Sequence, residues 1–257
     1  MKKRKEKSHE LFWSVVAAII IIVLIGLNLP EEEKQQEKQK ITLNNGQFLF
    51  YKTTNEKTPV IIVLHGTRQD SEVWFETNPQ GAFVEKAAEK GYAIIAPESK
   101  NPFCEEIKQW DTKKNSTDLE FFDEILNWIW LTENLDSERI YIAGISNGGI
   151  MASRLAEERG KNIRAIMIHS GTHADNAKIE NNLCYYQYTI NQTTISPNHP
   201  RTMLIHGTND TIIPYEHTLE YYNSLKGTGI GVILIPKING DHYWYEEYND
   251  LILSWFT

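Results

Sequence analysis

Residues 139–151 read RIYIAGISNGGIM, and this stretch decides the fold. Residues 139–143 are almost continuously apolar, which is typical of a strand buried on both faces, and a helical pattern starts at residue 147. The Gly-x-Ser-x-Gly motif between them lets the backbone turn sharply, so that the hydroxyl of Ser146 projects above the sheet. The helix then points its free N–H groups at the same space. We therefore predict Ser146 as a nucleophile and the backbone N–H of Asn147 as an oxyanion donor.

Short apolar runs alternate with helical periods on both sides of this stretch. Strands are predicted at residues 60–65, 92–96, 139–143, 164–169, 201–206 and 231–236, and an antiparallel hairpin at residues 41–53. Helices are predicted at residues 83–90, 117–131, 147–159, 218–225 and 248–256. In the second of these helices we expect Trp128 and Trp130 to pack against the core. The alternation predicts an α/β domain with a mainly parallel sheet.

An acid and a base for Ser146 follow two later strands. A serine hydroxyl is a weak nucleophile and needs a base that a carboxylate orients. Asp210 comes after the strand at 201–206, and His242 comes after the strand at 231–236. Of the eight histidines only His217 and His242 follow Asp210, and His217 falls in a helical stretch. The predicted catalytic residues are therefore Ser146, Asp210 and His242, in the order Ser, Asp, His.

The loop after the first long strand reads LHGTRQD at residues 64–70. Gly66 permits a tight turn, so we predict that the backbone N–H of Thr67 is the second oxyanion donor, opposite that of Asn147. Histidines also stand at three strand ends, and we expect them to brace loops through hydrogen bonds instead of acting as catalysts. These three are His65, His169 and His206.

The net charge of -8 over 257 residues hides two unlike parts. Residues 1–10 carry five basic and two acidic side chains and residues 11–29 carry no charge, so the remainder sums to -11. Such an acidic domain repels phosphate backbones, which argues against nucleic-acid binding. No Cys-x-x-Cys motif and no His/Cys cluster with metal spacing occurs, which argues against a structural zinc site, and we predict no metal site.

Residues 11–29, LFWSVVAAIIIIVLIGLNL, form an uncharged and mostly apolar run. At about 1.5 Å per residue a helix of this length roughly matches the ~30 Å hydrocarbon core of a bilayer, so we predict a transmembrane anchor. The basic residues 1–10 then stay in the cytoplasm, and the chain after a charged linker at residues 30–40 lies on the extracytoplasmic side. A cleaved signal peptide, and hence a secreted protein, is the alternative. The catalytic domain is predicted at residues 41–257.

Residues 171–200 are polar and aromatic and too long for an ordinary connection, so we predict a cap or binding insertion there. Cys104 and Cys184 lie in loops that follow strands at the same edge of the sheet. An exported location permits an intramolecular disulfide between them, and two separately buried free thiols are the alternative.

At these motifs the chain resembles the α/β-hydrolase superfamily, and within it the secreted esterases related to polyhydroxybutyrate depolymerases and to feruloyl and acetylxylan esterases. The resemblance covers nearly all of residues 58–250 and rests on LHGTRQD, Trp110-Asp111, residues 139–151, HGTND at 206–210 and GDHYW at 240–244. It implies a cofactor-free esterase with the triad and oxyanion donors named above, and it implies that Trp110 lies near the acyl pocket and binds substrate. Thr67 departs from the pattern, because a small Gly or Cys is usual there.

Two alternatives to an esterase stay open. A serine exopeptidase of the prolyl-oligopeptidase type also carries Gly-x-Ser-Asn-Gly-Gly and His-Gly-Thr-x-Asp, although such enzymes normally have a large peptide-filtering domain for which we expect no room. A catalytically silent α/β-hydrolase fold that serves as a binding module is the other. The prediction that we favour is a membrane-anchored, extracytoplasmic serine esterase that works through an acyl-enzyme intermediate.

Overall fold

A computed structural model of the chain describes residues 38–100, 107–179, 186–190 and 194–257. The chain divides into two units, Met1–Gln36 and Glu37–Thr257, and all described residues belong to the second. The predicted anchor at residues 11–29 and the pair Cys104 and Cys184 lie outside the described residues, so both stay predictions. None of the helices in the part of the chain that the structure describes has the length and hydropathy of a membrane span.

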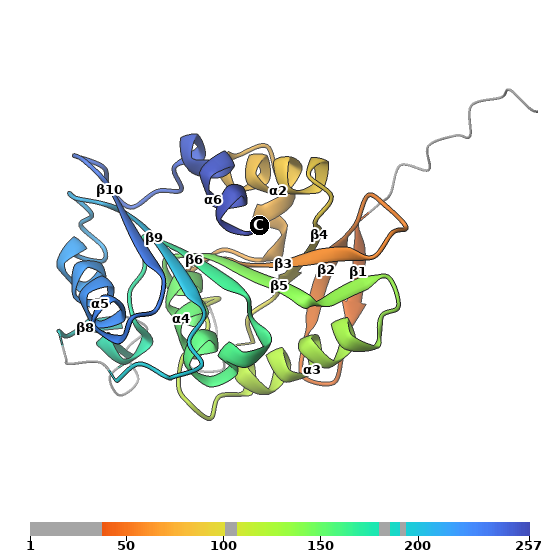
Figure 1. Ribbon diagram of the computed structural model, residues 1–257, viewed down its shortest axis with the longest axis horizontal. Coiled ribbons are helices and arrows are strands. Elements are labelled where there is room, and N and C mark those ends of the chain that lie inside the picture. Colours follow the sequence, from red (N-terminus) through yellow and green to blue (C-terminus); the bar gives the residue numbers. More distant parts are fainter. Residues whose placement is uncertain (1–37, 101–106, 180–185, 191–193) are drawn as a thin grey trace, which may run out of the picture. The chain divides into compact units, whose positions relative to one another are not determined.

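The second unit is built on a sheet of eight strands in the order β1-β2-β4-β3-β5-β6-β9-β10 (Figure 1). β1 and β2 form the antiparallel hairpin that the sequence predicts, β2 pairs antiparallel with β4, and all later pairings are parallel. The strands of this sheet are β1 Gln39–Thr42, β2 Gln47–Tyr51, β3 Thr58–Leu64, β4 Ala93–Pro97, β5 Leu135–Ile145, β6 Ala165–His169, β9 Arg201–Gly207 and β10 Val232–Lys237.

Helices cover both faces of this sheet. On one face α3, α4 and α5 contribute apolar residues to one buried cluster, and on the other face α2 and α6 contribute to a second cluster, as Figure 1 shows. The helices are α2 Pro79–Glu89, α3 Thr117–Leu131, α4 Asn147–Arg159, α5 Tyr215–Thr228 and α6 Asn249–Trp255. The predicted mainly parallel α/β architecture is confirmed.

Strand β3 shows why the buried strands read as continuous apolar runs. Ile62 and Leu64 belong to the cluster under α3 and α4, whereas Ile61 and Val63 belong to the cluster under α2 and α6. All four side chains are at most 1% exposed. Because burial of each such side chain contributes about 1.5–3 kcal/mol, the two clusters together hold the helices on the sheet.

Two details of the helices differ from the sequence-based prediction. Helix α2 begins at Pro79 and not at residue 83, because the side chain of Asn78 accepts hydrogen bonds from the N–H groups of Gln80 and Gly81. In α3, Trp128 packs edge-on against Phe48 as expected, with ring centroids 5.0 Å apart. The prediction for Trp130 is wrong, since this side chain is 70% exposed. Two residues along a helix correspond to a rotation of about 200°, which turns Trp130 away from the sheet.

The glycines of the Gly-x-Ser-x-Gly motif are required by close backbone contacts. A Cβ on Gly148 would lie 2.2 Å from the carbonyl oxygen of Leu64 and 2.6 Å from that of His65. A Cβ on Gly144 would lie 2.3 Å from the carbonyl oxygen of Gly148. The first turn of α4 therefore sits directly against the end of β3, where no side chain fits.

We predict that Gly148→Ala destabilises the domain by about 1–3 kcal/mol or more, because the added methyl group pushes α4 away from the end of β3. Gly227→Ala is the matched control: Gly227 lies in α5, and a Cβ there meets nothing within 4 Å. The control should change stability only slightly or raise it by about 0.5–1 kcal/mol. Urea unfolding measures both variants, and equal stability of the two would contradict the close-contact explanation.

Candidate active site

Ser146 occupies a strained turn between β5 and α4. Its backbone has φ 56° and ψ -123°, a conformation that residues with side chains rarely adopt. The Ser146 N–H donates to the carbonyl oxygen of His169 at 2.9 Å, which fixes the turn to the end of β6. Ser146 precedes the first residue of α4, yet its side chain makes no capping hydrogen bond with the helix. The turn thus keeps the hydroxyl from being used up in helix capping.

Asp210 and His242 are brought together from the ends of β9 and β10. His242 Nδ1 lies 2.7 Å from Asp210 Oδ2, and the His242 side chain is 17% exposed whereas that of Asp210 is fully buried. Asp210 Oδ1 accepts hydrogen bonds from the N–H groups of Ile212 and Ile213 at 2.8 and 2.9 Å. His217, which the sequence rejected as the base, lies in α5 as expected.

The electrostatics keep Asp210 ionised. Burial by itself would raise the pKa of the carboxyl group, but hydrogen bonds from His206 and His242 and the N–H of Ile213 outweigh it and hold the pKa well below its usual range. A permanently charged carboxylate orients the imidazole of His242 with its Nδ1 proton toward Asp210 and leaves Nε2 as the basic nitrogen.

The loop predicted to carry an oxyanion donor lies beside the nucleophile. A Cβ on Gly66 would be 3.4 Å from Cβ of Ser146, and the Gly66 N–H donates to the side chain of Gln69 at 2.8 Å. In the described part of the chain, the N–H of Thr67 donates to no protein acceptor. The role of the Thr67 N–H as an oxyanion donor stays a prediction. The other predicted donor, Asn147, is the first residue of α4.

Trp110, expected at the acyl pocket, is fully buried. Its indole N–H donates to the carbonyl oxygen of His65 at 2.9 Å, and its ring packs 4.8 Å from the ring of His65. Its backbone N–H donates to the side-chain oxygen of Asn147. Trp110 thus contacts the buried side of the turn that carries Thr67. Its side chain offers no exposed surface to a substrate.

The three strand-end histidines brace loops, as predicted. His65 accepts through Nε2 from the N–H of Ser99 at 3.3 Å. His169 accepts through Nε2 from the N–H of Tyr245 at 3.0 Å, and its carbonyl oxygen accepts from the N–H of Ser146. His169 therefore connects the Ser146 turn to the loop that follows His242. Burial lowers the pKa of His169 well below the usual histidine range, which keeps the ring neutral. His206 has a contact that the sequence did not reveal: its Nε2 lies 3.0 Å from Asp210 Oδ2.

Asp118 is a second residue that sequence reasoning missed as part of the site. It is fully buried at the start of α3 and accepts hydrogen bonds from the N–H of Lys100 at 3.2 Å and of Asp111 at 2.7 Å. The carboxylate therefore joins the segment after β4 to the segment that carries Trp110. Burial raises the pKa of Asp118 to about 6, although the two backbone hydrogen bonds oppose the rise.

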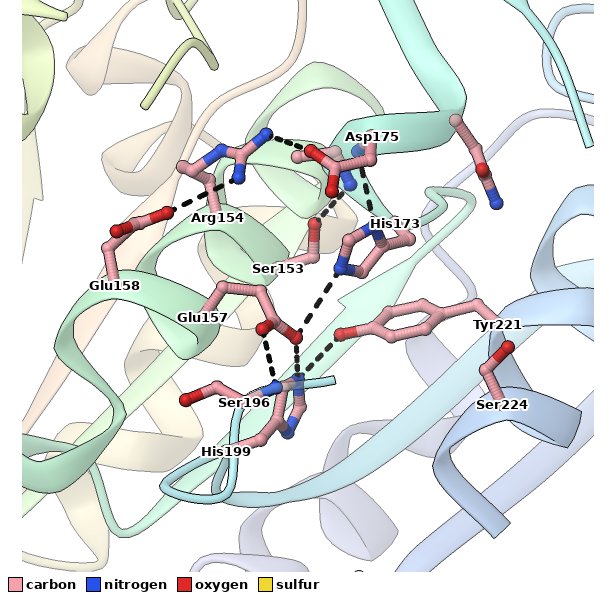
Figure 2. Close-up of polar contacts among 12 residues, drawn as sticks. Ser153, Arg154, Glu157, Glu158, His173, Asp175, Ser196, His199, Tyr221 and Ser224 are labelled. Atoms are coloured by element: carbon pink, nitrogen blue, oxygen red, sulfur yellow. Dashed lines mark hydrogen bonds and ion pairs between the residues drawn. The ribbon is translucent and has the colours of Figure 1, made fainter. Parts of the chain in front are cut away.

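The two ends of the predicted insertion at residues 171–200 are fastened to α4 (Figure 2). At the first end, Ser153 Oγ accepts from the N–H of Ala174 at 2.8 Å, and Arg154 pairs with Asp175 at 2.5 Å. At the second end, Glu157 accepts from the N–H of Ser196 at 2.7 Å. Between the two ends, β7 Ala177–Ile179 pairs antiparallel with β8 Tyr186–Tyr188. That the insertion caps a substrate site stays a prediction.

Glu157 also faces two fully buried histidine side chains, as Figure 2 shows. Its Oε1 lies 3.4 Å from Nε2 of His173 and 3.7 Å from Nε2 of His199. Because His173 Nδ1 accepts from the N–H of Asp175, its Nε2 carries the proton and is not a metal ligand. Burial lowers the pKa of His199 to about 4. In the described residues, no group of three or more His, Cys, Asp or Glu side chains is arranged to hold a metal ion.

A family model described as the prolyl oligopeptidase family matches residues 105–253, which is more than half of the chain. The chain belongs to the prolyl oligopeptidase family. The predicted membership of the α/β-hydrolase superfamily is thereby confirmed. The sequence analysis named the same family for its alternative function, a serine exopeptidase of the prolyl-oligopeptidase type.

Individual relatives of this prolyl oligopeptidase family member are esterases as well as peptidases. A poly(3-hydroxyoctanoate) depolymerase of Pseudomonas fluorescens is 26% identical over 216 residues, which cover 77% of this chain and 73% of the depolymerase. The acetyl xylan esterase from Aspergillus awamori superposes with a TM-score of 0.69 at 16% identity, covering 86% of this chain and 98% of the esterase. The Pyrococcus horikoshii acylaminoacyl peptidase superposes with a TM-score of 0.62 at 18% identity, and the chain covers only 42% of its length.

These comparisons establish the class of this family member. It is a serine hydrolase with the α/β-hydrolase fold. At their low identities the two structural likenesses show the fold alone.

We predict that Asp118→Asn makes this family member respond differently to pH. The folded pKa of Asp118, about 6, lies above its ordinary value of 3.8, so in the wild type this group costs stability as the pH rises through that interval. The free energy of unfolding of the variant relative to the wild type should therefore rise between about pH 4 and pH 6, by up to about 3 kcal/mol. Urea unfolding at several pH values measures it.

Glu120→Gln is the control for this comparison, because Glu120 is exposed on the same turn of α3. The difference in free energy of unfolding between Glu120→Gln and the wild type should not change over the same pH interval. A flat difference for Asp118→Asn as well would contradict the raised pKa.

Proposed function

We propose that this chain is a serine esterase that hydrolyses carboxylic esters through a covalent acyl-enzyme intermediate. The observation that carries the proposal is the junction of three loops at the carboxyl edge of the sheet. Ser146 stands on a positive-φ turn that leaves its hydroxyl uncapped, and the Asp210–His242 pair joined at 2.7 Å is tied to that turn through His169. Nucleophile, base and orienting acid are the three groups that acyl transfer by a serine requires.

In the proposed mechanism His242 first acts as a general base. Its Nε2 removes the proton from Ser146 Oγ, and Oγ attacks the ester carbonyl carbon. The carbonyl oxygen becomes an oxyanion, which the backbone N–H groups of Thr67 and Asn147 stabilise. When the tetrahedral intermediate collapses, the C–O bond to the alcohol breaks, and the His242 imidazolium gives its proton to the leaving alkoxide oxygen.

Water then releases the acyl group by the same steps. His242 Nε2 removes a proton from water, the hydroxide oxygen attacks the acyl carbon, and the proton returns to Ser146 Oγ as the acid leaves. Asp210 stays ionised throughout, because its hydrogen bonds to His206, His242 and the backbone hold its pKa low against the effect of burial. Its charge stabilises the imidazolium that forms in each step.

The relatives suggest the class of ester. The depolymerase that aligns with 77% of this chain is named for poly(3-hydroxyoctanoate), a polyester of hydroxy acids. The acetyl xylan esterase covered at 98% of its length is named for acetyl esters of a polysaccharide. We therefore place small acyl esters and hydroxyalkanoate oligomers first among the substrates to be tried.

A peptidase is the second candidate, and the family match favours it. The matching family is described as that of prolyl oligopeptidase, and the structure of an acylaminoacyl peptidase superposes on the chain. The same serine chemistry cleaves amides, with an amine instead of an alcohol as the leaving group. The chain spans 42% of that peptidase, whereas it spans 73% and 98% of the two ester-cleaving relatives, and for this reason the esterase is placed first.

The proposal includes a location. The apolar run at residues 11–29 supports a single-pass anchor with the catalytic domain on the extracytoplasmic side, and cleavage after this run would yield a secreted enzyme. An exported domain would permit a disulfide between Cys104 and Cys184.

We predict that Ser146→Ala lowers kcat for p-nitrophenyl butyrate by about 1,000-fold or more and abolishes labelling by a fluorophosphonate probe, because the nucleophile is gone. Ser254→Ala is the control, since Ser254 is exposed on α6 and its hydroxyl donates to the carbonyl oxygen of Leu251 in the same helix. It should keep full activity and labelling. An N-acyl-aminoacyl p-nitroanilide assayed in parallel separates the two candidates.

Faster cleavage of the anilide than of the ester would favour the peptidase. A wild-type protein that is not labelled at all would favour a silent binding module. Activity of Ser146→Ala equal to the wild type would refute the assignment of the nucleophile.

We predict that the full chain, expressed in a bacterial host, stays in the membrane fraction after a carbonate wash and that its catalytic domain is cut by protease added from outside. Removal of residues 11–29 should release the protein from the membrane. Removal of the linker residues 31–37, as the control, should not. Recovery of the full chain's product in the medium, lacking the first 29 residues, would favour the cleaved signal instead.

A further inference from the structure

We propose that Asn147 is a positioning residue through its side chain, which holds the two oxyanion donors at a fixed spacing by bonding to the backbone of Trp110. The inference rests on the proposed function, in which the backbone N–H groups of Thr67 and Asn147 stabilise the oxyanion. It goes beyond that function because the mechanism uses only the backbone of Asn147, whereas the inference gives its side chain a measurable effect on the rate.

The side-chain amide of Asn147 pairs with both backbone polar groups of Trp110. Its Oδ1 accepts from the N–H of Trp110, and its Nδ2 donates to the Trp110 carbonyl oxygen at 3.4 Å. These partners fix the orientation of the amide, because a backbone N–H only donates and a carbonyl oxygen only accepts. Asn147 is 1% exposed and Trp110 is fully buried. The amide is therefore engaged inside the protein and does not itself contact a substrate.

The same segment of the chain also holds the turn that carries the other donor, Thr67. The carbonyl oxygen of Lys108 accepts from the N–H of Arg68 at 2.8 Å. The indole N–H of Trp110 donates to the carbonyl oxygen of His65 at 2.9 Å. The turn is thus bonded to this segment at two points, one on each side of Thr67.

The turn is strained, so these bonds matter for its shape. The N–H of Gln69 donates to the carbonyl oxygen of Gly66 at 3.2 Å, which closes a four-residue turn, and Arg68 at its third position has φ 67°. A positive φ at that position is typical of glycine, and other residues keep it only where the surroundings constrain the backbone. The bond from Arg68 to Lys108 is such a constraint, because it breaks if the peptide between Thr67 and Arg68 rotates.

The contact between α4 and β3 does not hold this turn by itself. Gly148 packs against the carbonyl oxygens of Leu64 and His65, and this contact places the start of α4 beside the end of the strand. Thr67 lies two residues beyond His65 and takes no part in that contact. Its position depends in addition on the bonds that its turn makes to the segment that ends at Trp110.

Residues 108–110 therefore connect the two halves of the proposed oxyanion hole. The turn with Thr67 is bonded to Lys108, and the side chain of Asn147 is bonded to Trp110, two residues further along. Both donors must lie about 2.7–3.1 Å from the oxyanion, and a misplacement of about 1 Å can cost about 100-fold in rate. Loss of the Asn147 amide would let the two halves move apart while the nucleophile keeps its place.

Asn147→Leu tests the inference, because leucine keeps the branched shape of the side chain and removes both bonds to Trp110. The kcat for p-nitrophenyl butyrate should fall about 10- to 100-fold, while KM changes by less than about threefold, since the oxyanion forms only after Ser146 Oγ attacks. Butyl trifluoromethyl ketone forms an oxyanion when Ser146 Oγ adds to its carbonyl carbon. Its inhibition constant should rise by the same factor as kcat/KM falls.

Trp110→Phe is a second variant that acts on the same segment from the other side. Phenylalanine keeps an aromatic ring in the core and removes the N–H that holds His65. The kcat should fall about three- to tenfold, again with little change in KM. Should Asn147→Leu fail to fold, as judged by urea unfolding, this variant decides.

Asn45→Leu is the matched control. The amide of Asn45 donates to Glu124 Oε1 at 2.9 Å and joins the β1–β2 hairpin to α3, with β2 and β4 between this hairpin tip and β3 in the sheet order. The variant loses a half-buried amide contact and should keep the wild-type kcat and inhibition constant.

The outcomes separate this inference from the proposed function. Wild-type kcat in folded Asn147→Leu, or a loss that lies in KM with kcat unchanged, would overturn the inference and leave the esterase assignment standing. Absence of Ser146-dependent activity in the wild type would refute the proposed function, and the inference with it. An inhibition constant that stays at the wild-type value while kcat falls would also overturn the inference, because the defect would then lie outside the oxyanion hole.

Discussion

The contact between the first turn of α4 and the end of β3 is the constraint on which the site depends. Gly148 lies so close to the carbonyl oxygens of Leu64 and His65 that no Cβ fits between them. This approach places the N-terminus of α4 and the turn at Gly66 on the two sides of Ser146. The hydrogen bond that the Trp110 indole donates to His65 supports the same turn from the core. The positions of Ser146 and of both proposed oxyanion donors are therefore set by backbone packing.

Buried histidines at the strand ends connect this nucleophile turn to the loops of the acid and the base. Through its carbonyl oxygen and its ring, His169 holds the Ser146 turn and the Tyr245 backbone at once. His206 in turn contacts Asp210 and reaches α5 through Thr218. Side chains from neighbouring strands thus satisfy polar groups of the loops that carry the site.

The sequence predicts what is local or repeated, and it misses what depends on how distant segments meet. The sheet, its helices and the Ser146 turn follow from apolar periodicity and from one glycine motif, and the structure confirms these elements. The partners of His206 and Asp118 lie on segments that only the fold brings together, so the spacing of residues in the sequence does not predict these contacts. Trp110 illustrates the same limit, since its burial beneath His65 joins residues 45 positions apart. The start of α2 at Pro79 was missed because its first turn has no apolar period.

The attachment of both ends of the 171–200 segment to α4 has a consequence for how such enzymes diversify. Ala174 and Ser196 are each held by a side chain of the helix that begins at the nucleophile. The residues between these two attachment points can therefore change in length or composition without pulling on β6 or β9, the strands that the segment connects. Under the prediction that the segment caps the substrate site, substitutions between Ala174 and Ser196 would change substrate preference while the helix that begins at the nucleophile keeps its place.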